Sequence, residues 1–228
     1  MNKFSIASPI TAAALAIALL GIVAVPARAE KAYVSVFGSV NFPEADTFSY
    51  AEPGGYEIYR FDMETGYSFG AAAGLRLTDY ARVEIEVSHF ATEADHYFGL
   101  TSGSYPGYGP IDGTLGLANI WLDWPNDSPV TPYAGLGAGF GHVTADTELE
   151  TPSFPGVRFD ALTGSDTGFA FQLGAGARME LSENIVLDVG YRFKSIQNLE
   201  FAFPSSGRIA KDVDVNMHLF QASLSYAF

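Results

Sequence analysis

The chain has 228 residues, of which 48% are hydrophobic and 17% are charged, and its formal net charge is −14. A soluble domain usually carries more charged residues, while glycine, tyrosine and phenylalanine are abundant here. Cysteine is absent, which excludes disulfides and thiolate metal sites. The acidic balance argues against nucleic acid as a partner, because nucleic-acid binding requires basic patches.

The first 29 residues have the pattern of a cleaved secretory signal peptide. Lys3 provides a positive start, and the segment Ile10–Val25 is uncharged and apolar or small. Ala27-Arg28-Ala29 then supplies the small residues that signal peptidase requires. An uncleaved helical anchor is the alternative, but the apolar segment is slightly short for one. We predict cleavage after Ala29, so that residues 30–228 form the mature domain.

Beyond residue 29 the hydrophobic pattern has period two, as in strands with one apolar face. The last segment is the clearest case, because one face carries Phe220, Ala222, Leu224, Tyr226 and Phe228, and the other Gln221, Ser223, Ser225 and Ala227. Such apolar faces run for about ten residues, the length of a tilted strand that crosses a bilayer. A sheet that crosses lipid must close into a barrel, because an open edge would leave backbone groups unpaired.

Eight strands are predicted in chain order, at residues 32–41, 66–77, 81–90, 113–124, 131–142, 167–181, 185–195 and 215–228. Short connections follow the even strands (78–80, 125–130 and 182–184), and long connections follow the odd strands (42–65, 91–112, 143–166 and 196–214). Short periplasmic turns opposite long external loops are typical of outer-membrane barrels. The sequence therefore predicts an all-β, eight-stranded, antiparallel, up-and-down transmembrane β-barrel, with both ends of the mature domain on the periplasmic side.

Several segments resemble a known family. Residues 119–123 (NIWLD), followed after a turn by 131–140 (TPYAGLGAGF), are similar to the central hairpin of OmpA-like and opacity-type barrel proteins. Residues 171–176 (FQLGAG) and 190–193 (GYRF) resemble later strands of the same porin-like group. The resemblance covers about residue 32 to the end. It implies a barrel in the outer membrane of a Gram-negative bacterium, in a family of anchors, adhesins, surface antigens and modest channels.

The C-terminal residues also resemble the family's assembly signal. Phe228 is preceded by apolar or aromatic residues at every second position, namely Tyr226, Leu224 and Phe220. The resemblance implies that periplasmic chaperones and the barrel-assembly machinery are partners during biogenesis. Outer-membrane lipid and lipopolysaccharide are the expected surroundings of the folded barrel.

Charged residues of the predicted strands share the inward parity, and they are Arg76, Arg82, Glu84, Glu86, Asp123, Arg178, Glu180, Asp188 and Arg192. Buried charges must be paired, because their desolvation is costly. We therefore predict a network of ion pairs that fills the lumen, since eight strands enclose space for little more than their own side chains. The alternative is a gate whose pairs switch to let small ions pass.

The glycines at 135, 137, 139 and 141 could be mistaken for a dinucleotide-binding motif. That motif requires a helix directly after the glycines, and no helical pattern follows here. We interpret these glycines as lumen positions that make room for larger neighbours. No cofactor is predicted.

The predicted long connections are acidic and rich in tyrosine and phenylalanine, most clearly at 43–65 and 143–166. Carboxylates bind Ca²⁺ and Mg²⁺, but no segment has the spacing of a calcium loop, so no metal site is predicted. Such aromatic loops suit contacts with an extracellular protein or glycan. Aromatic residues near strand ends can equally belong to the interfacial girdle of a barrel.

Some eight-stranded barrels modify lipids, so nucleophiles were considered. Ser88 and His89 are neighbours on one strand and point to opposite faces, so they cannot form a catalytic pair. His142 shares a face with Thr144, and His218 lies on the lipid-facing parity of the last strand. No catalytic residue is predicted, and lipid-A modification is the less favoured alternative.

The sequence thus predicts a non-enzymatic integral outer-membrane barrel with a structural and surface-interaction role, which supports the envelope and presents loops to partners. A narrow passive channel for small solutes or ions is the main alternative.

Overall fold

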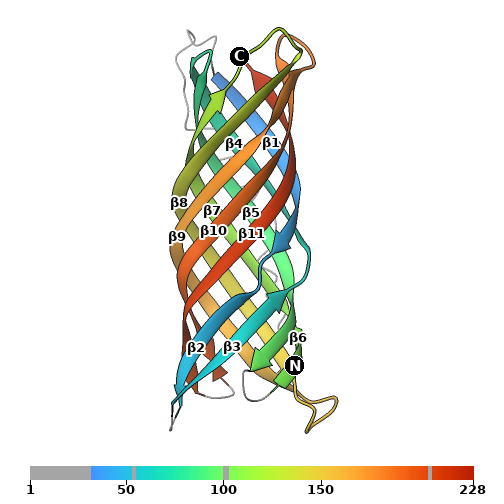
Figure 1. The fold of residues 1–228 in the computed structure, drawn as a ribbon, viewed down its shortest axis with the longest axis vertical. Helices are drawn as coiled ribbons and strands as arrows, with labels where there is room; N and C mark the ends of the chain where they lie inside the picture. Colours follow the sequence, from blue (N-terminus) through green and yellow to red (C-terminus); the bar gives the residue numbers. More distant parts are fainter. Residues whose placement is uncertain (1–31, 53–54, 100–102, 205–206) are drawn as a thin grey trace.

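The computed structural model describes residues 32–52, 55–99, 103–204 and 207–228, which form eleven antiparallel strands (Figure 1). They are β1 (Ala32–Pro43), β2 (Asp46–Glu52), β3 (Gly55–Met63), β4 (Gly66–Thr78), β5 (Ala81–Gly99), β6 (Gly103–Tyr108), β7 (Pro110–Asp123), β8 (Val130–Glu150), β9 (Arg158–Glu180), β10 (Ile185–Phe203) and β11 (Arg208–Ala227). Within these residues, no helix is long and apolar enough to cross a membrane. The predicted signal peptide lies outside the described residues.

Eight strands close into a ring in the order β1-β4-β5-β7-β8-β9-β10-β11, which we call the lipid-facing ring. Its register can be followed through directly paired residues, Ala32, Leu75, Val83, Ile120, Leu136, Leu173, Phe193, His218 and Phe42. One circuit therefore shifts the register by 42 − 32 = 10 residues along β1. This stagger tilts the strands against the barrel axis, as Figure 1 shows.

Both ends of the ring's chain meet at one rim, where the backbone N–H of Phe228 donates to the carbonyl of Ala32 at 3.0 Å. The three short predicted turns lie at the same rim, which is uppermost in Figure 1. The predicted strands of the ring and their up-and-down order are confirmed.

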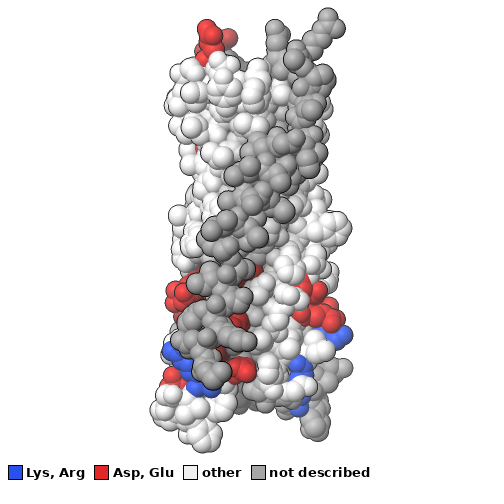
Figure 2. All heavy atoms as spheres, turned by 180° about the vertical axis from the view of Figure 1, so that it is seen from behind, with Lys and Arg blue, Asp and Glu red and all other residues white. Residues whose placement is uncertain are grey.

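Large apolar side chains cover the outside of the lipid-facing ring and remain exposed. They include Val36, Val40, Ile85, Ile120, Leu136, Phe140, Leu173, Val189, Phe220 and Leu224. On the face seen in Figure 2, charged side chains gather mainly toward the end opposite the C-terminus, with a few acidic residues at the other end, and are sparse between them. Such an exterior suits lipid rather than water.

The four long connections were predicted as loops, and this prediction is wrong for most of their described residues, which form strands. Strands β5, β8, β9, β10 and β11 continue past the lipid-facing ring, and β2, β3 and β6 join them. Pairing then runs β2-β3-β5-β6-β8-β9-β10-β11 and closes through Lys211 and Ser49. This second ring of eight, which we call the distal ring, is stacked on the first.

The two rings have opposite polarity. Along β11, Gln221, Ser223 and Ser225 face the lumen of the lipid-facing ring, whereas Val215, Met217 and Leu219 are buried farther along the same face. The outward face changes from exposed apolar residues such as Phe220 to Asn216 and Asp214. Outside the bilayer the exterior meets water, so the hydrophobic effect favours apolar residues inside. The predicted strands were defined by an outward apolar face. They therefore end too early, at the point where the apolar residues change to the inward face.

The topology places the β8–β9 connection and the β7–β8 connection at opposite ends of the barrel. Ser153 and Asp127 are exposed in these two connections, and the natural chain has no cysteine. We expect Ser153→Cys to react with a membrane-impermeant maleimide on intact cells. Asp127→Cys should react only after the outer membrane is permeabilised. Equal labelling of Asp127→Cys on intact cells would contradict this orientation.

Candidate functional site in the lumen and on the outer surface

Glu86 on β5 lies at the centre of a polar cluster inside the lipid-facing ring. Its carboxylate accepts a hydrogen bond from Lys194 Nζ at 2.5 Å, across the lumen on β10. It also accepts from Gln172 Nε2 at 2.9 Å and from Asn119 Nδ2 at 3.1 Å. Glu86, Lys194 and Gln172 are almost fully buried. The cluster therefore joins strands that are not neighbours in the sheet.

A second cluster, nearer the rim at which Ala32 and Phe228 meet, is built on Asp123. Arg82 donates two hydrogen bonds to this carboxylate, at 2.7 and 3.0 Å, and Arg178 lies 3.4 Å from it. The hydroxyl of Tyr33 accepts from Arg82 at 3.2 Å and donates to Glu84 at 3.0 Å. A bidentate arginine–carboxylate pair is geometrically specific, so this cluster has little freedom to rearrange.

Arg192 and Asp188 form a third group on β10. The hydroxyl of Tyr133 links them, because it donates to Asp188 at 2.7 Å and accepts from Arg192 at 2.7 Å. The direct distance between Arg192 Nη2 and Asp188 Oδ1 is longer, 3.9 Å. The guanidinium of Arg192 also lies 4.3 Å from the ring centre of Trp121. The hydroxyl of Tyr133 is therefore the nearer polar partner of this arginine, and the indole ring covers its guanidinium.

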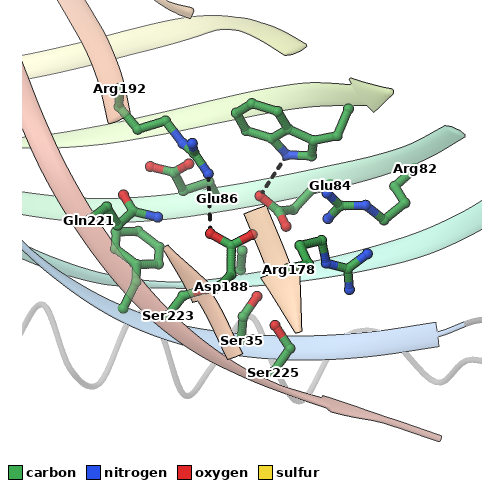
Figure 3. A pocket seen from close by; sticks show the side chains of 13 residues that line it. Ser35, Arg82, Glu84, Glu86, Arg178, Asp188, Arg192, Gln221, Ser223 and Ser225 are labelled. Atoms are coloured by element: carbon green, nitrogen blue, oxygen red, sulfur yellow. Dashed lines mark hydrogen bonds and ion pairs between the residues drawn. The ribbon is translucent and has the colours of Figure 1, made fainter. Parts of the chain in front are cut away.

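These groups surround a cavity of about 20 Å³, into which Arg192, Asp188 and Glu84 point (Figure 3). A cavity of this size holds about one water molecule. The clusters contain four cations and four carboxylates, namely Arg82, Arg178, Arg192 and Lys194 with Glu84, Glu86, Asp123 and Asp188. Equal numbers of opposite charges suit a permanently paired filling of the lumen.

Seven of the nine predicted lumen charges lie in these clusters, while Arg76 is half-buried and Glu180 is exposed. Glu180 keeps the predicted inward parity, since it is paired directly with the buried Val186, but it lies at the rim, where its side chain is exposed. Sequence reasoning missed Lys194, although it shares the parity of Arg192. It also missed uncharged members of the network, which are Tyr33, Asn119, Tyr133 and Gln172. Their amide and hydroxyl groups carry no charge signal in the sequence.

Three of the four β8 glycines between residues 135 and 141 lie against larger lumen side chains. A Cβ at Gly135 would overlap Trp121, one at Gly137 would overlap Asn119, and one at Gly141 would be 2.8 Å from Ile196 Cδ1. β8 continues as a strand through these positions. Their interpretation as positions that make room for larger neighbours is confirmed for Gly135, Gly137 and Gly141, whereas a Cβ at Gly139 would meet the backbone of Gly116.

Apolar side chains fill the lumen beyond the charged clusters and continue into the distal ring. Phe90, Leu115, Ile196 and Leu219 are among the most deeply buried of them. In the distal ring, Tyr97 donates or accepts a 2.6 Å hydrogen bond with Thr147. Burial raises the pKa of Tyr97 above its usual value, so its hydroxyl stays protonated. We call this apolar filling the plug.

The residues considered as nucleophiles and bases do not form a triad with one another. Ser88 is buried in the lumen, where its hydroxyl donates to Glu86 and accepts from Lys194, both at 3.1 Å. His89 faces outward and lies 3.2 Å from Thr114, and His142 lies 2.9 Å from Thr167. The Ser88–Lys194 contact resembles a serine–lysine pair, but this lysine is ion-paired and enclosed. Among the described residues, no group of three or more His, Asp and Glu side chains is placed to hold a metal ion.

The predicted assembly-signal residues all lie on the outside of β11 or at its end. Phe220, Leu224, Tyr226 and Phe228 are 63%, 48%, 49% and 63% exposed, which places their side chains against lipid. Their role in assembly stays a prediction.

A closed ring with an apolar exterior and a paired ionic lumen defines an integral membrane β-barrel. The family described as "Outer membrane protein beta-barrel domain" matches residues 13–228. The chain belongs to this family and is an outer-membrane protein.

Individual relatives agree with that assignment. An uncharacterized protein of Brucella abortus is 26% identical over 215 residues, which cover 80% of this chain and 73% of the relative. OprG from Pseudomonas aeruginosa superposes with a TM-score of 0.55 and 15% identity, covering 87% and 96% of the two chains. Neisserial surface protein A superposes with a TM-score of 0.50 and 17% identity, covering 86% of this chain and 97% of its own chain. At these identities the solved structures show the fold alone.

The enclosed ion pair between Glu86 and Lys194 leads to a stability prediction. Glu86→Leu leaves the ammonium of Lys194 buried without its carboxylate, so we expect a loss of about 3–5 kcal/mol in the free energy of unfolding. Urea titration of the protein folded in lipid vesicles measures this quantity. Glu180→Leu is the matched control, since Glu180 is exposed.

The double change Glu86→Leu with Lys194→Met should recover most of the loss, because it removes both charges together. Equal destabilisation by Glu86→Leu and Glu180→Leu would contradict the role assigned to the network.

Proposed function

We propose that this protein is a non-conducting, non-enzymatic outer-membrane barrel that supports the envelope and presents a rigid surface outside the cell. The observation that carries the proposal is the filled interior. The ionic clusters occupy the lumen of the lipid-facing ring, and the plug occupies the space beyond them. A barrel closed twice along its axis is suited to an anchoring and presenting role rather than to transport.

The alternative of a narrow channel requires a gate that can open. Switching the ion pairs would open only the part of the lumen that holds the charged clusters, because the plug beyond them is a cluster of buried apolar side chains. The buried apolar side chains would have to leave their contacts, and each large side chain contributes roughly 1.5–3 kcal/mol by burial. This cost favours a closed barrel.

The distal ring supports a surface role. It carries charged side chains on its outside, such as Arg60, Lys211 and Glu200, which are 61%, 59% and 49% exposed. The β-structure holds these groups away from the bilayer on a framework with its own apolar core. A preorganised surface loses little conformational entropy when it binds. The partner we propose is an extracellular protein or glycan.

A lipid-modifying activity is not proposed, because Ser88 lies inside the barrel and His142 lies outside it. Acyl-chain release from lipopolysaccharide, abolished by Ser88→Ala or His142→Ala, would overturn this part of the proposal.

Single-channel recording in planar bilayers tests the closed barrel. We expect the folded protein to give no conductance steps, with a general porin in the same chamber as the positive control. The double variant Arg82→Ala with Arg192→Ala removes two cations from the ionic clusters and should also be silent, because the plug still blocks the lumen. Regular steps from the natural protein, or steps that appear when the two arginines are removed, would favour the channel.

A further inference from the structure

Three polar side chains meet on the lipid-facing wall, at the border between its apolar and polar parts. His218 of β11 lies with its Nε2 2.6 Å from the carboxylate of Glu44, which directly follows β1. The other ring nitrogen, Nδ1, contacts the hydroxyl of Tyr191 on β10. All three remain accessible, because the side chains of His218 and Glu44 are 36% and 49% exposed and Tyr191 is 38% exposed. We call this group the outer-wall triad.

The backbone holds the triad in place. His218 is paired directly with Phe42 on one side and with Phe193 on the other. The backbone N–H of Glu44 donates to the carbonyl of Asn216 at 2.8 Å, which continues the β1–β11 ladder and aligns the carboxylate with the imidazole. The strand pairing therefore fixes the positions of the three residues relative to one another.

Aromatic rings surround the triad on the same wall. The ring of His218 lies 5.3 Å from Phe193 and 5.9 Å from Tyr191, and Phe42 packs edge-on against Phe220 at 6.1 Å. Phe42 and Phe220 are 43% and 63% exposed. Ring faces and edges at this level offer packing surface for the apolar C–H face of a sugar as well as for acyl chains.

The polarity of the wall on either side of the triad indicates where the apolar and polar parts of a ligand would lie. Toward the periplasm the wall is apolar, with Val40, Phe220 and Leu224 exposed to lipid. In the other direction the wall continues into Asn216 and Asp214. A molecule with an acyl chain on the apolar part would therefore place its headgroup at the triad.

We propose that the outer-wall triad binds the sugar headgroup of a glycolipid in the outer leaflet. Glu44 can accept hydrogen bonds from sugar hydroxyls, and the tyrosine hydroxyl and imidazole can donate or accept them. Phosphate is the less suitable headgroup, because Glu44, Asp46 and Asp214 make this part of the wall acidic. An aromatic girdle with no specific ligand is the ordinary explanation for rings at this level.

The other two outward histidines of the lipid-facing ring provide a comparison within the same molecule. His89 lies near Phe69 and its Nδ1 is 3.2 Å from the hydroxyl of Thr114, and His142 Nδ1 is 2.9 Å from the hydroxyl of Thr167. Each has a hydroxyl neighbour and lies on the outward face, but the carboxylate–imidazole–phenol arrangement is formed at His218. His89→Ala is therefore a matched control for His218→Ala.

Native mass spectrometry of the full folded protein, released from phosphocholine micelles with added rough-type lipopolysaccharide, measures retained glycolipid. We expect a one-to-one adduct with the natural protein and with His89→Ala. His218→Ala and Glu44→Ala should weaken the adduct about tenfold or more, the effect of losing one charge-assisted hydrogen bond. Tyr191→Phe keeps the ring and should weaken it less. Heat-dependent gel migration verifies that each variant is folded.

Four results would overturn the proposal. Equal adducts in all variants would show that the triad takes no part, and equal loss in His89→Ala would indicate a general girdle effect. Stronger binding by Glu44→Gln would show that phosphate is recognised instead of sugar. Binding of free maltose at the same concentration as lipopolysaccharide would show that the ligand is a soluble saccharide rather than a membrane lipid.

Discussion

Closure of the backbone hydrogen-bond ladder is the constraint on which the structure depends. Lipid offers no partner for an N–H or C=O group, so every strand that crosses it needs two neighbours. The β1–β11 pairing provides the last of these, and the register shift of ten residues per circuit tilts the strands. That tilt and the number of strands together set a lumen that side chains can fill.

Polarity follows from closure. Once the ring is closed, each strand has one face toward lipid and one toward a narrow interior, so the interior must accommodate every polar group placed there. Glu86 and Lys194 form an ion pair across the lumen, and Asp123 forms ion pairs with two arginines. Past the bilayer the exterior meets water instead, and the same strands exchange their polar and apolar faces. Five continuous strands thus run from a ring with an apolar exterior, suited to lipid, into a ring with a polar exterior, suited to water.

This inversion links the fold to the proposed role. The ionic clusters make the membrane part a closed anchor, and the plug gives the distal ring a core like that of a soluble barrel. A ring with its own core can hold charged surface groups rigidly outside the membrane. The outer-wall triad lies where the two polarities meet, which is the level at which lipid headgroups surround a barrel.

The sequence by itself determined the fold class, the eight strands of the lipid-facing ring and the inward parity of seven lumen charges. These depend on local period-two patterns, which one chain segment contains in full. Only the tertiary structure decided that Glu86 pairs with Lys194, that Glu44 lies beside His218, and that the predicted loops continue as a second ring. Those features depend on register between strands distant in sequence, and on which solvent surrounds each level of the barrel.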